Sequence, residues 1–129
     1  MRLHSFPTRR SSDLLARAAA TDGYYARKHA VALLAASPVQ AVHDAPLALK
    51  VARELLAGEI QSDPQMFEAV AAAYAVNKDF REASAQQRVA ITKASALGWN
   101  TAAMQRRLSA YRADQPWTGD LFAAPASDK

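Results

Sequence analysis

Ser37, His43 and Asp44 have the residue types of a nucleophile, a general base and an orienting carboxylate within one short stretch of the chain. A hydrolase of that kind also needs a strained turn that exposes the nucleophile, together with backbone N–H groups that bind the oxyanion. No Gly-x-Ser-x-Gly turn surrounds Ser37. The stretch is rich in turn-forming residues, so we interpret it as a loop between two helices.

Metal binding is the second chemistry that the histidines suggest. From Leu15 onward the chain has His29 and His43 as its histidines, and the whole chain has no Cys. A metal site needs several convergent ligands, and neither the His-Glu-x-x-His nor the EF-hand spacing is present. The four glycines are isolated, so they do not form a phosphate-binding loop. We therefore expect neither a metal nor a cofactor.

Asp79 and Glu82 come nearest to the paired carboxylates of general acid and base catalysis. The same spacing is that of a helix capping box, with Asp79 in place of the usual Ser or Thr. Helix capping accounts for both residues with ordinary physics. We therefore expect no catalytic residues and a protein that is not an enzyme.

A cluster of cations near an indole is the remaining arrangement with possible chemistry. Arg106, Arg107 and Arg112 precede Trp117, and such side chains contact phosphates and stack on bases in nucleic-acid-binding proteins. From Leu15 onward, however, 13 basic residues stand against 11 acidic ones. We interpret the arginines as a solvated face of a helix and expect no nucleic-acid partner.

The elements that position these residues are predicted to be helices. Ala occurs 31 times, whereas Val, Ile and Thr together occur 14 times, and this balance favours helix over strand. Gly and Pro divide the chain into windows of helical length. The predicted helices run from Tyr24 to Ala36, from Pro46 to Ala57, from Asp63-Pro64 to the turn at 77–79, from there to Gly98, and from Asn100 or Thr101 to Ala113. Charges or prolines interrupt every apolar run, so we expect no membrane span.

Capping residues mark the ends of these predicted helices. Asp63 is expected to cap the third helix, with proline at its first position. Gly58 and Gly98 are expected to end the second and fourth helices in the left-handed conformation. Ala83 is predicted to lie at the contact between the third and fourth helices, where a small side chain permits close packing.

A spacing of 35 residues relates Asp44 to Asp79, Ala48 to Ala83 and Leu56 to Ile91, which indicates a repeated helical hairpin. Within 67–91 the residues closely resemble the tetratricopeptide repeat family. Phe67 stands for its leading aromatic residue, Val70-Ala71 for its Leu-Gly or Leu-Ala pair, Tyr74 for the next aromatic residue, Asp79-Phe80 for its turn, Glu82-Ala83 for the start of its second helix and Ala90-Ile91 for its closing Ala-Leu. The usual final Pro is absent, and Ser95 stands near its place.

The resemblance, which covers about residues 24–97, implies an all-α fold. It implies a tetratricopeptide-like α-solenoid fragment, made of two antiparallel helical hairpins and a C-terminal capping helix that covers the last hydrophobic face. It also implies the C-terminal part of a bacterial repeat protein. The groove of such a solenoid commonly binds peptides or other proteins. The residues expected to face it are Gln65, Glu68, Ala69, Ala72 and Ala75.

The function that follows from the resemblance is a non-catalytic protein–protein interaction or scaffold module, with a protein or peptide as partner. The alternative is a regulatory or structural C-terminal tail of an enzyme or signalling protein whose catalytic domain lies upstream. The family members that clamp a peptide carboxylate use Lys and Asn in the groove, and Glu68 and Ala72 depart from that pattern. Recognition of a chaperone tail is therefore not expected.

Three regions are expected along the chain. Residues 4–14 resemble the translation of an adapter oligonucleotide used in DNA sequencing, so 1–14 is interpreted as an adapter-derived or disordered leader. The helical domain is expected over 15–113, and 114–129 should be extended and aromatic to Phe122 and disordered after it. Residues 14–20, Leu-Leu-Ala-Arg-Ala-Ala-Ala, fit either the remnant of a signal peptide or the start of a helix. Bacterial cytoplasm and periplasm therefore both remain open as locations.

Overall fold

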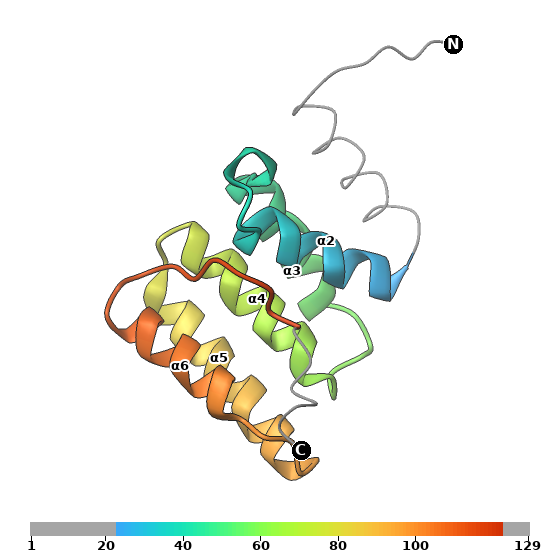
Figure 1. Cartoon of the computed structure of the whole chain (residues 1–129). Coiled ribbons are helices and arrows are strands. Elements are labelled where there is room, and N and C mark those ends of the chain that lie inside the picture. Colours follow the sequence, from blue (N-terminus) through green and yellow to red (C-terminus); the bar gives the residue numbers. More distant parts are fainter. Residues whose placement is uncertain (1–22, 123–129) are drawn as a thin grey trace.

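The computed structural model describes residues 23–122, and in that range the chain is helical and contains no strand (Figure 1). The all-α prediction is therefore confirmed. The elements are α2 (Tyr24–Ala36), the 3-10 helix η1 (Gln40–Val42), α3 (Ala45–Leu56), α4 (Pro64–Val76), α5 (Phe80–Ala96) and α6 (Ala102–Arg112). The expected leader at 1–14 and the expected disorder after Phe122 lie outside the described residues. Within 23–122 the structure contains no helix of sufficient length and apolarity to cross a membrane.

Aspartates begin three of the helices. Asp44, Asp63 and Asp79 each accept a hydrogen bond from a backbone N–H in the first turn, at 3.2, 3.0 and 3.2 Å. These bonds satisfy N–H groups that have no partner within the helix. The predicted capping box is only half formed, because the Asp79 N–H donates to the Tyr74 carbonyl and is not available to Glu82.

The predicted helix ends are correct for Gly98 and wrong for Gly58. Gly98 has a φ of 80° and ends α5 in the left-handed conformation. Gly58 is not among the residues with positive φ; its N–H instead donates to the Leu55 carbonyl at 3.1 Å in a right-handed turn. Lys78, with a φ of 65°, takes the left-handed position between α4 and α5. A side chain with a Cβ atom is therefore present where glycine would fit without strain.

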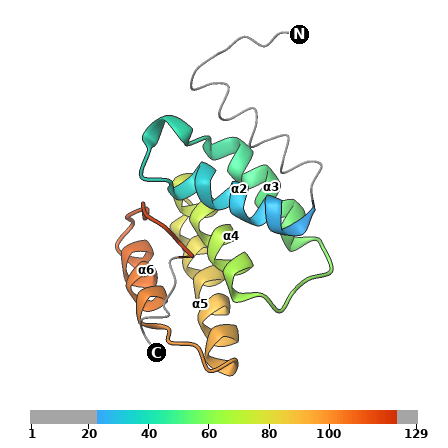
Figure 2. The same cartoon turned by 45° about the vertical axis from the view of Figure 1, so that its right-hand side comes forward.

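The helices form two consecutive hairpins and a final helix. α2 packs on α3, α4 packs on α5, and α6 packs on α5 (Figures 1 and 2). α2 also lies beside α4, so the first helices of the two hairpins are neighbours. This close packing is possible because alanine dominates the contact surfaces.

α4 is the central helix and is buried on almost every side. Its buried residues are Pro64, Met66, Phe67, Glu68, Ala69, Val70, Ala71, Ala72, Ala73 and Ala75. Neighbouring helices cover part of this surface, and the remainder needs another cover. The chain beyond α6 provides it.

After α6 the chain turns at Asp114, which has a φ of 59°, and runs back across α4 (Figures 1 and 2). It passes the end of α2 at Ala36 and reaches Lys28 and His29 of the same helix. We call Pro116–Phe122 the tail segment. Its Leu121 is 4% exposed and belongs to the main hydrophobic core, and Trp117 packs against both clusters of buried residues. A segment without helix or strand thus completes the core over α4.

Candidate functional site

The tail segment lies in a groove whose walls are α2 and α6 and whose floor is α4; we call this the α2–α4–α6 groove. Hollows flank the segment within it. One of about 330 Å³ is lined by α2 residues, including Ala32 and Leu33, and by Gly119–Phe122. Another of about 420 Å³ lies between the Ala75 end of α4 and the Pro116 end of the tail segment. The groove is therefore wider than the chain that occupies it.

A buried ion pair joins the floor of the groove to the α6 wall. Arg107 Nε donates to Glu68 Oε2 at 2.7 Å, and Arg107 Nη2 donates to Glu68 Oε1 at 3.0 Å. The two residues are 6% and 3% exposed, respectively. Gln87 Nε2 on α5 donates to Glu68 Oε2 at 2.9 Å and to the Met104 carbonyl at 3.0 Å. Burial raises the pKa of the Glu68 carboxyl, and the charge of Arg107 and the hydrogen bonds from Gln87 and Arg107 oppose that rise.

The same guanidinium also contacts the tail segment. Arg107 Nη2 donates to the Leu121 carbonyl at 3.4 Å, and its central carbon lies 5.9 Å from the centre of the Trp117 ring. An arginine that forms two parallel hydrogen bonds with a carboxylate is held in one orientation. Glu68 therefore positions Arg107 as a donor to a main-chain carbonyl in the groove.

A second ion pair stands at the other end of the groove, where α2 meets the start of α4. Lys28 Nζ lies 2.8 Å from Asp63 Oδ2 and 2.9 Å from Gln65 Oε1, and the Tyr24 hydroxyl donates to the same Asp63 oxygen at 2.8 Å. Burial tends to raise the pKa of the Asp63 carboxyl, but the hydrogen bonds from Lys28, Tyr24 and the Gln65 N–H outweigh it. The pKa of Asp63 is therefore below its ordinary value. Lys28 Nζ also lies 5.5 Å from the centre of the Phe122 ring.

The tail segment also contacts α2. The Gly119 N–H donates to the Ala36 carbonyl at 2.7 Å. The Phe122 ring meets the His29 imidazole edge to face, with 5.0 Å between the ring centres. Main-chain hydrogen bonds and apolar contacts therefore both hold this segment.

The residues expected to face a partner lie along this path, but most of them are covered. Glu68, Ala69, Ala72 and Ala75 are at most 3% exposed, and Gln65 is half-buried. Gln65 and Glu68 line a small hollow together with Leu121 and Phe122 of the tail segment. The reason is that neighbouring helices pack on α4 and that the chain after α6 folds back over it beside Gln65, Glu68 and Ala75. The helix pattern alone does not reveal this return of the chain.

One interpretation from the sequence is wrong. Arg107 does not belong to a solvated basic face, because it is buried against Glu68, whereas Arg106 and Arg112 are exposed. Two sequence features could have indicated this pair. Glu68 interrupts a long apolar run without capping a helix, and Gln87 occupies a core position of its helix stripe. Polar residues at core positions need partners.

The contacts of Ser37, His43 and Asp44 are those of a loop. Ser37 Oγ accepts a hydrogen bond from the Val39 N–H at 3.0 Å, and His43 Nε2 lies 2.6 Å from the Ser37 carbonyl oxygen. Asp44 caps α3 through the Leu47 N–H. Across residues 23–122, no three His, Cys, Asp or Glu side chains are close enough to share a metal ion.

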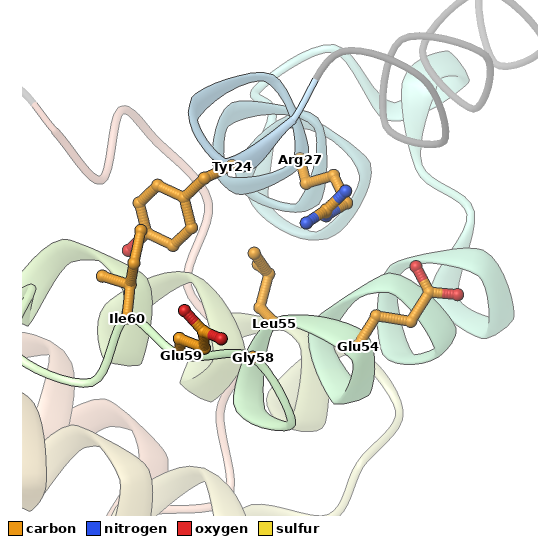
Figure 3. A pocket seen from close by; sticks show the side chains of 7 residues that line it. All are labelled: Tyr24, Arg27, Glu54, Leu55, Gly58, Glu59 and Ile60. Carbon is orange, nitrogen blue, oxygen red and sulfur yellow. The ribbon is translucent and has the colours of Figure 1, made fainter.

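A separate pocket of about 270 Å³ lies between the start of α2 and the end of α3 (Figure 3). In Figure 3, Arg27 reaches over the pocket from α2, Leu55 rises from α3, and Glu54 and Glu59 stand on either side. This volume is just below the range of ordinary ligand pockets, about 300–1,000 Å³. The mixed charge of its rim favours neither an anion nor a cation, so the α2–α4–α6 groove is the better candidate site.

The arrangement of the groove suits an extended polypeptide. It offers a carbonyl acceptor at the end of α2, a guanidinium donor on α6 and an apolar surface over α4.

Comparison of the chain with protein-family models, with curated proteins and with solved structures gives no match.

Proposed function

We propose that the chain is a non-catalytic protein-interaction module of the tetratricopeptide type, whose α2–α4–α6 groove binds a peptide or an extended protein segment. The observation that carries this proposal is the tail segment. An extended stretch of polypeptide lies in the groove, with Leu121 buried and with main-chain hydrogen bonds to α2 and α6. A surface that accommodates one such segment has the chemistry to bind another.

The arrangement of the helices supports the same proposal. The first helices of the two hairpins lie side by side, and a spacing of 35 residues relates the second helices, α3 and α5. Both features are expected of stacked helical repeats. In such repeats the first helices line one continuous surface. We further propose that the chain acts as a scaffold and is part of a larger bacterial protein, because its motifs resemble the end of a repeat array.

Selection from a library of random peptides, displayed on phage and exposed to the whole chain, tests the proposal. The groove variant is Leu33→Glu, because Leu33 is 43% exposed and lines the hollow beside the tail segment. The matched control is Leu97→Glu, a leucine that is 58% exposed and follows α5 directly.

We expect selected peptides to share one sequence pattern and to bind Leu33→Glu about tenfold more weakly, because the new carboxylate would stand against an apolar ligand. Binding to Leu97→Glu should equal binding to the wild type. The proposal fails if no pattern is enriched, or if both variants bind the peptides as the wild type does.

A further inference from the structure

From Pro116 to Leu121 the tail segment alternates between inward and outward residues, as an extended peptide on a surface does. Pro116, Thr118 and Asp120 are exposed, whereas Trp117 and Gly119 are half-buried. Leu121 completes the inward series as a fully buried residue. This period of two shows that one face of the segment contacts the groove and the other faces solvent.

The groove forms hydrogen bonds with main-chain atoms of this segment at two points. The acceptor is the carbonyl of Ala36, the last residue of α2, which lacks an intrahelical partner because it ends the helix. The donor is Arg107 Nη2, which bonds the Leu121 carbonyl and is oriented by Glu68. Both groups can bind the backbone of any extended segment, whatever its side chains.

Selectivity comes from four positions of the tail segment: Trp117, Gly119, Leu121 and Phe122. The Leu121 side chain is buried in the main hydrophobic core, and an apolar side chain of this size suits that position. Gly119 has a φ of 140°, and a Cβ atom at this position would lie 3.4 Å from Trp117 Nε1, so glycine is favoured. Trp117 and Phe122 stand beside cations, at 5.9 Å from Arg107 and 5.5 Å from Lys28, which favours aromatic rings at both places.

Other features indicate that the tail segment can be exchanged. It contains no helix or strand, its outward residues are exposed, and hollows of about 330 and 420 Å³ adjoin it. The exposed side chain of Leu33 lines the first of them, so apolar surface is available beside the segment. A longer or bulkier ligand could use this surface as well.

We propose that the tail segment is an intramolecular ligand of the α2–α4–α6 groove, and that the groove binds in trans an extended segment of the same chemistry in competition with it. That ligand has an aromatic residue, a glycine two residues later, a leucine two residues after the glycine, and an aromatic residue next. This inference rests on the proposed function and specifies its ligand. The tethered segment has a high effective concentration, so it lowers the apparent affinity for the external ligand.

The test uses a fluorescein-labelled peptide with the sequence of residues 114–122, titrated into whole chains and followed by fluorescence anisotropy. Two variants weaken the internal segment. Leu121→Asp places a charge in the hydrophobic core, and Gly119→Val introduces a branched side chain at a φ that L residues rarely adopt. Circular dichroism and thermal unfolding establish whether each variant is folded.

We expect both variants to remain folded and to bind the peptide about tenfold more tightly than the wild type, because the internal competitor is lost. A peptide that itself carries Leu121→Asp should not bind. The exposed-leucine control, Leu97→Glu, should bind the peptide as weakly as the wild type does.

Two results would overturn the inference. In one, the folded variants bind the peptide no more tightly than the wild type. In the other, both variants lose cooperative unfolding, which would show that the helices do not fold without the tail segment in place. If this peptide fails while peptides from the random library still bind the groove, the inference falls and the proposed function stands. Failure of both sets of peptides removes both proposals.

Discussion

Arg107 on α6 and Glu68 on α4 meet through two parallel hydrogen bonds, at 2.7 and 3.0 Å, in a site that is nearly closed to solvent. A buried charge is tolerated only when it is paired and hydrogen-bonded, and here Gln87 adds a third donor to the carboxylate. The pair therefore fixes how α6 sits on the second hairpin. Because Arg107 also bonds the Leu121 carbonyl, the same contact fixes the tail segment.

Arg107→Met should lower the free energy of unfolding by about 3 to 5 kcal/mol, because it leaves the Glu68 carboxylate buried without its cation. Urea unfolding followed by circular dichroism measures this change. Arg106→Met is the matched control, since Arg106 is the exposed neighbour on the same helix, and it should stay within about 0.5 kcal/mol of the wild type.

The double variant Glu68→Leu with Arg107→Met should recover most of that loss, because an apolar pair removes both desolvation penalties. Equal losses in the single and the double variant would contradict this explanation. The cost would then lie in the packing of the arginine stem and not in the unpaired carboxylate.

Asp63→Asn should destabilise the chain by about 2 to 4 kcal/mol at neutral pH, because Lys28, which is 3% exposed, loses its carboxylate partner. Asparagine is itself a good helix cap, so the start of α4 should persist. Urea unfolding at neutral pH gives the difference from the wild type.

The pH dependence of that difference has a definite sign. The pKa of Asp63 is lower in the folded chain than its ordinary value of 3.8, so the stabilisation is complete above that value. It is lost as the pH falls through the lowered pKa, because the folded state must then also take up the proton. The difference between wild type and Asp63→Asn should therefore shrink below about pH 4. A difference that stays constant in acid would exclude the ion pair as its source.

Lys78→Gly should stabilise the chain by about 1 kcal/mol. Lys78 has a φ of 65°, a conformation that costs an L residue about 1 to 2 kcal/mol, and glycine avoids most of this cost despite its greater freedom in the unfolded chain. The midpoint of urea unfolding should rise for Lys78→Gly. It should not rise for Lys78→Ala, which keeps the Cβ atom, and an equal rise in both variants would point to the lost charge instead.

Ala83→Leu should destabilise the chain by about 1 to 3 kcal/mol through overpacking. Ala83 is fully buried in a small cluster with Ala71, Ala75 and Tyr111, where the facing helices leave no room for a larger side chain. Ala96→Leu, at the exposed end of the same helix, should stay within about 0.5 kcal/mol. Unchanged thermal stability of Ala83→Leu would contradict the close contact between α4 and α5.

The helices themselves could be predicted because local signals determine them. The first predicted helix, Tyr24 to Ala36, agrees with α2 at both ends, and the other helix ends lie within about two residues of the predictions. These signals are the aspartate caps, the prolines at first positions and the glycine at 98. Each acts on residues only a few positions away, so it can be recognised from the sequence. The burial of Ala83 and Gln87 follows from helical spacing in the same way.

The groove and its occupant depend on contacts between residues far apart in the chain. Glu68 and Arg107 are 39 residues apart, and Lys28 and Asp63 are 35 apart, so no local period relates them. The position of the tail segment over α4 likewise depends on Gly119 reaching the end of α2 and on Leu121 reaching the core. Local propensity sets where each helix begins and ends, whereas the need to pair buried charges and to cover the last apolar face of α4 is satisfied only when all the helices are assembled.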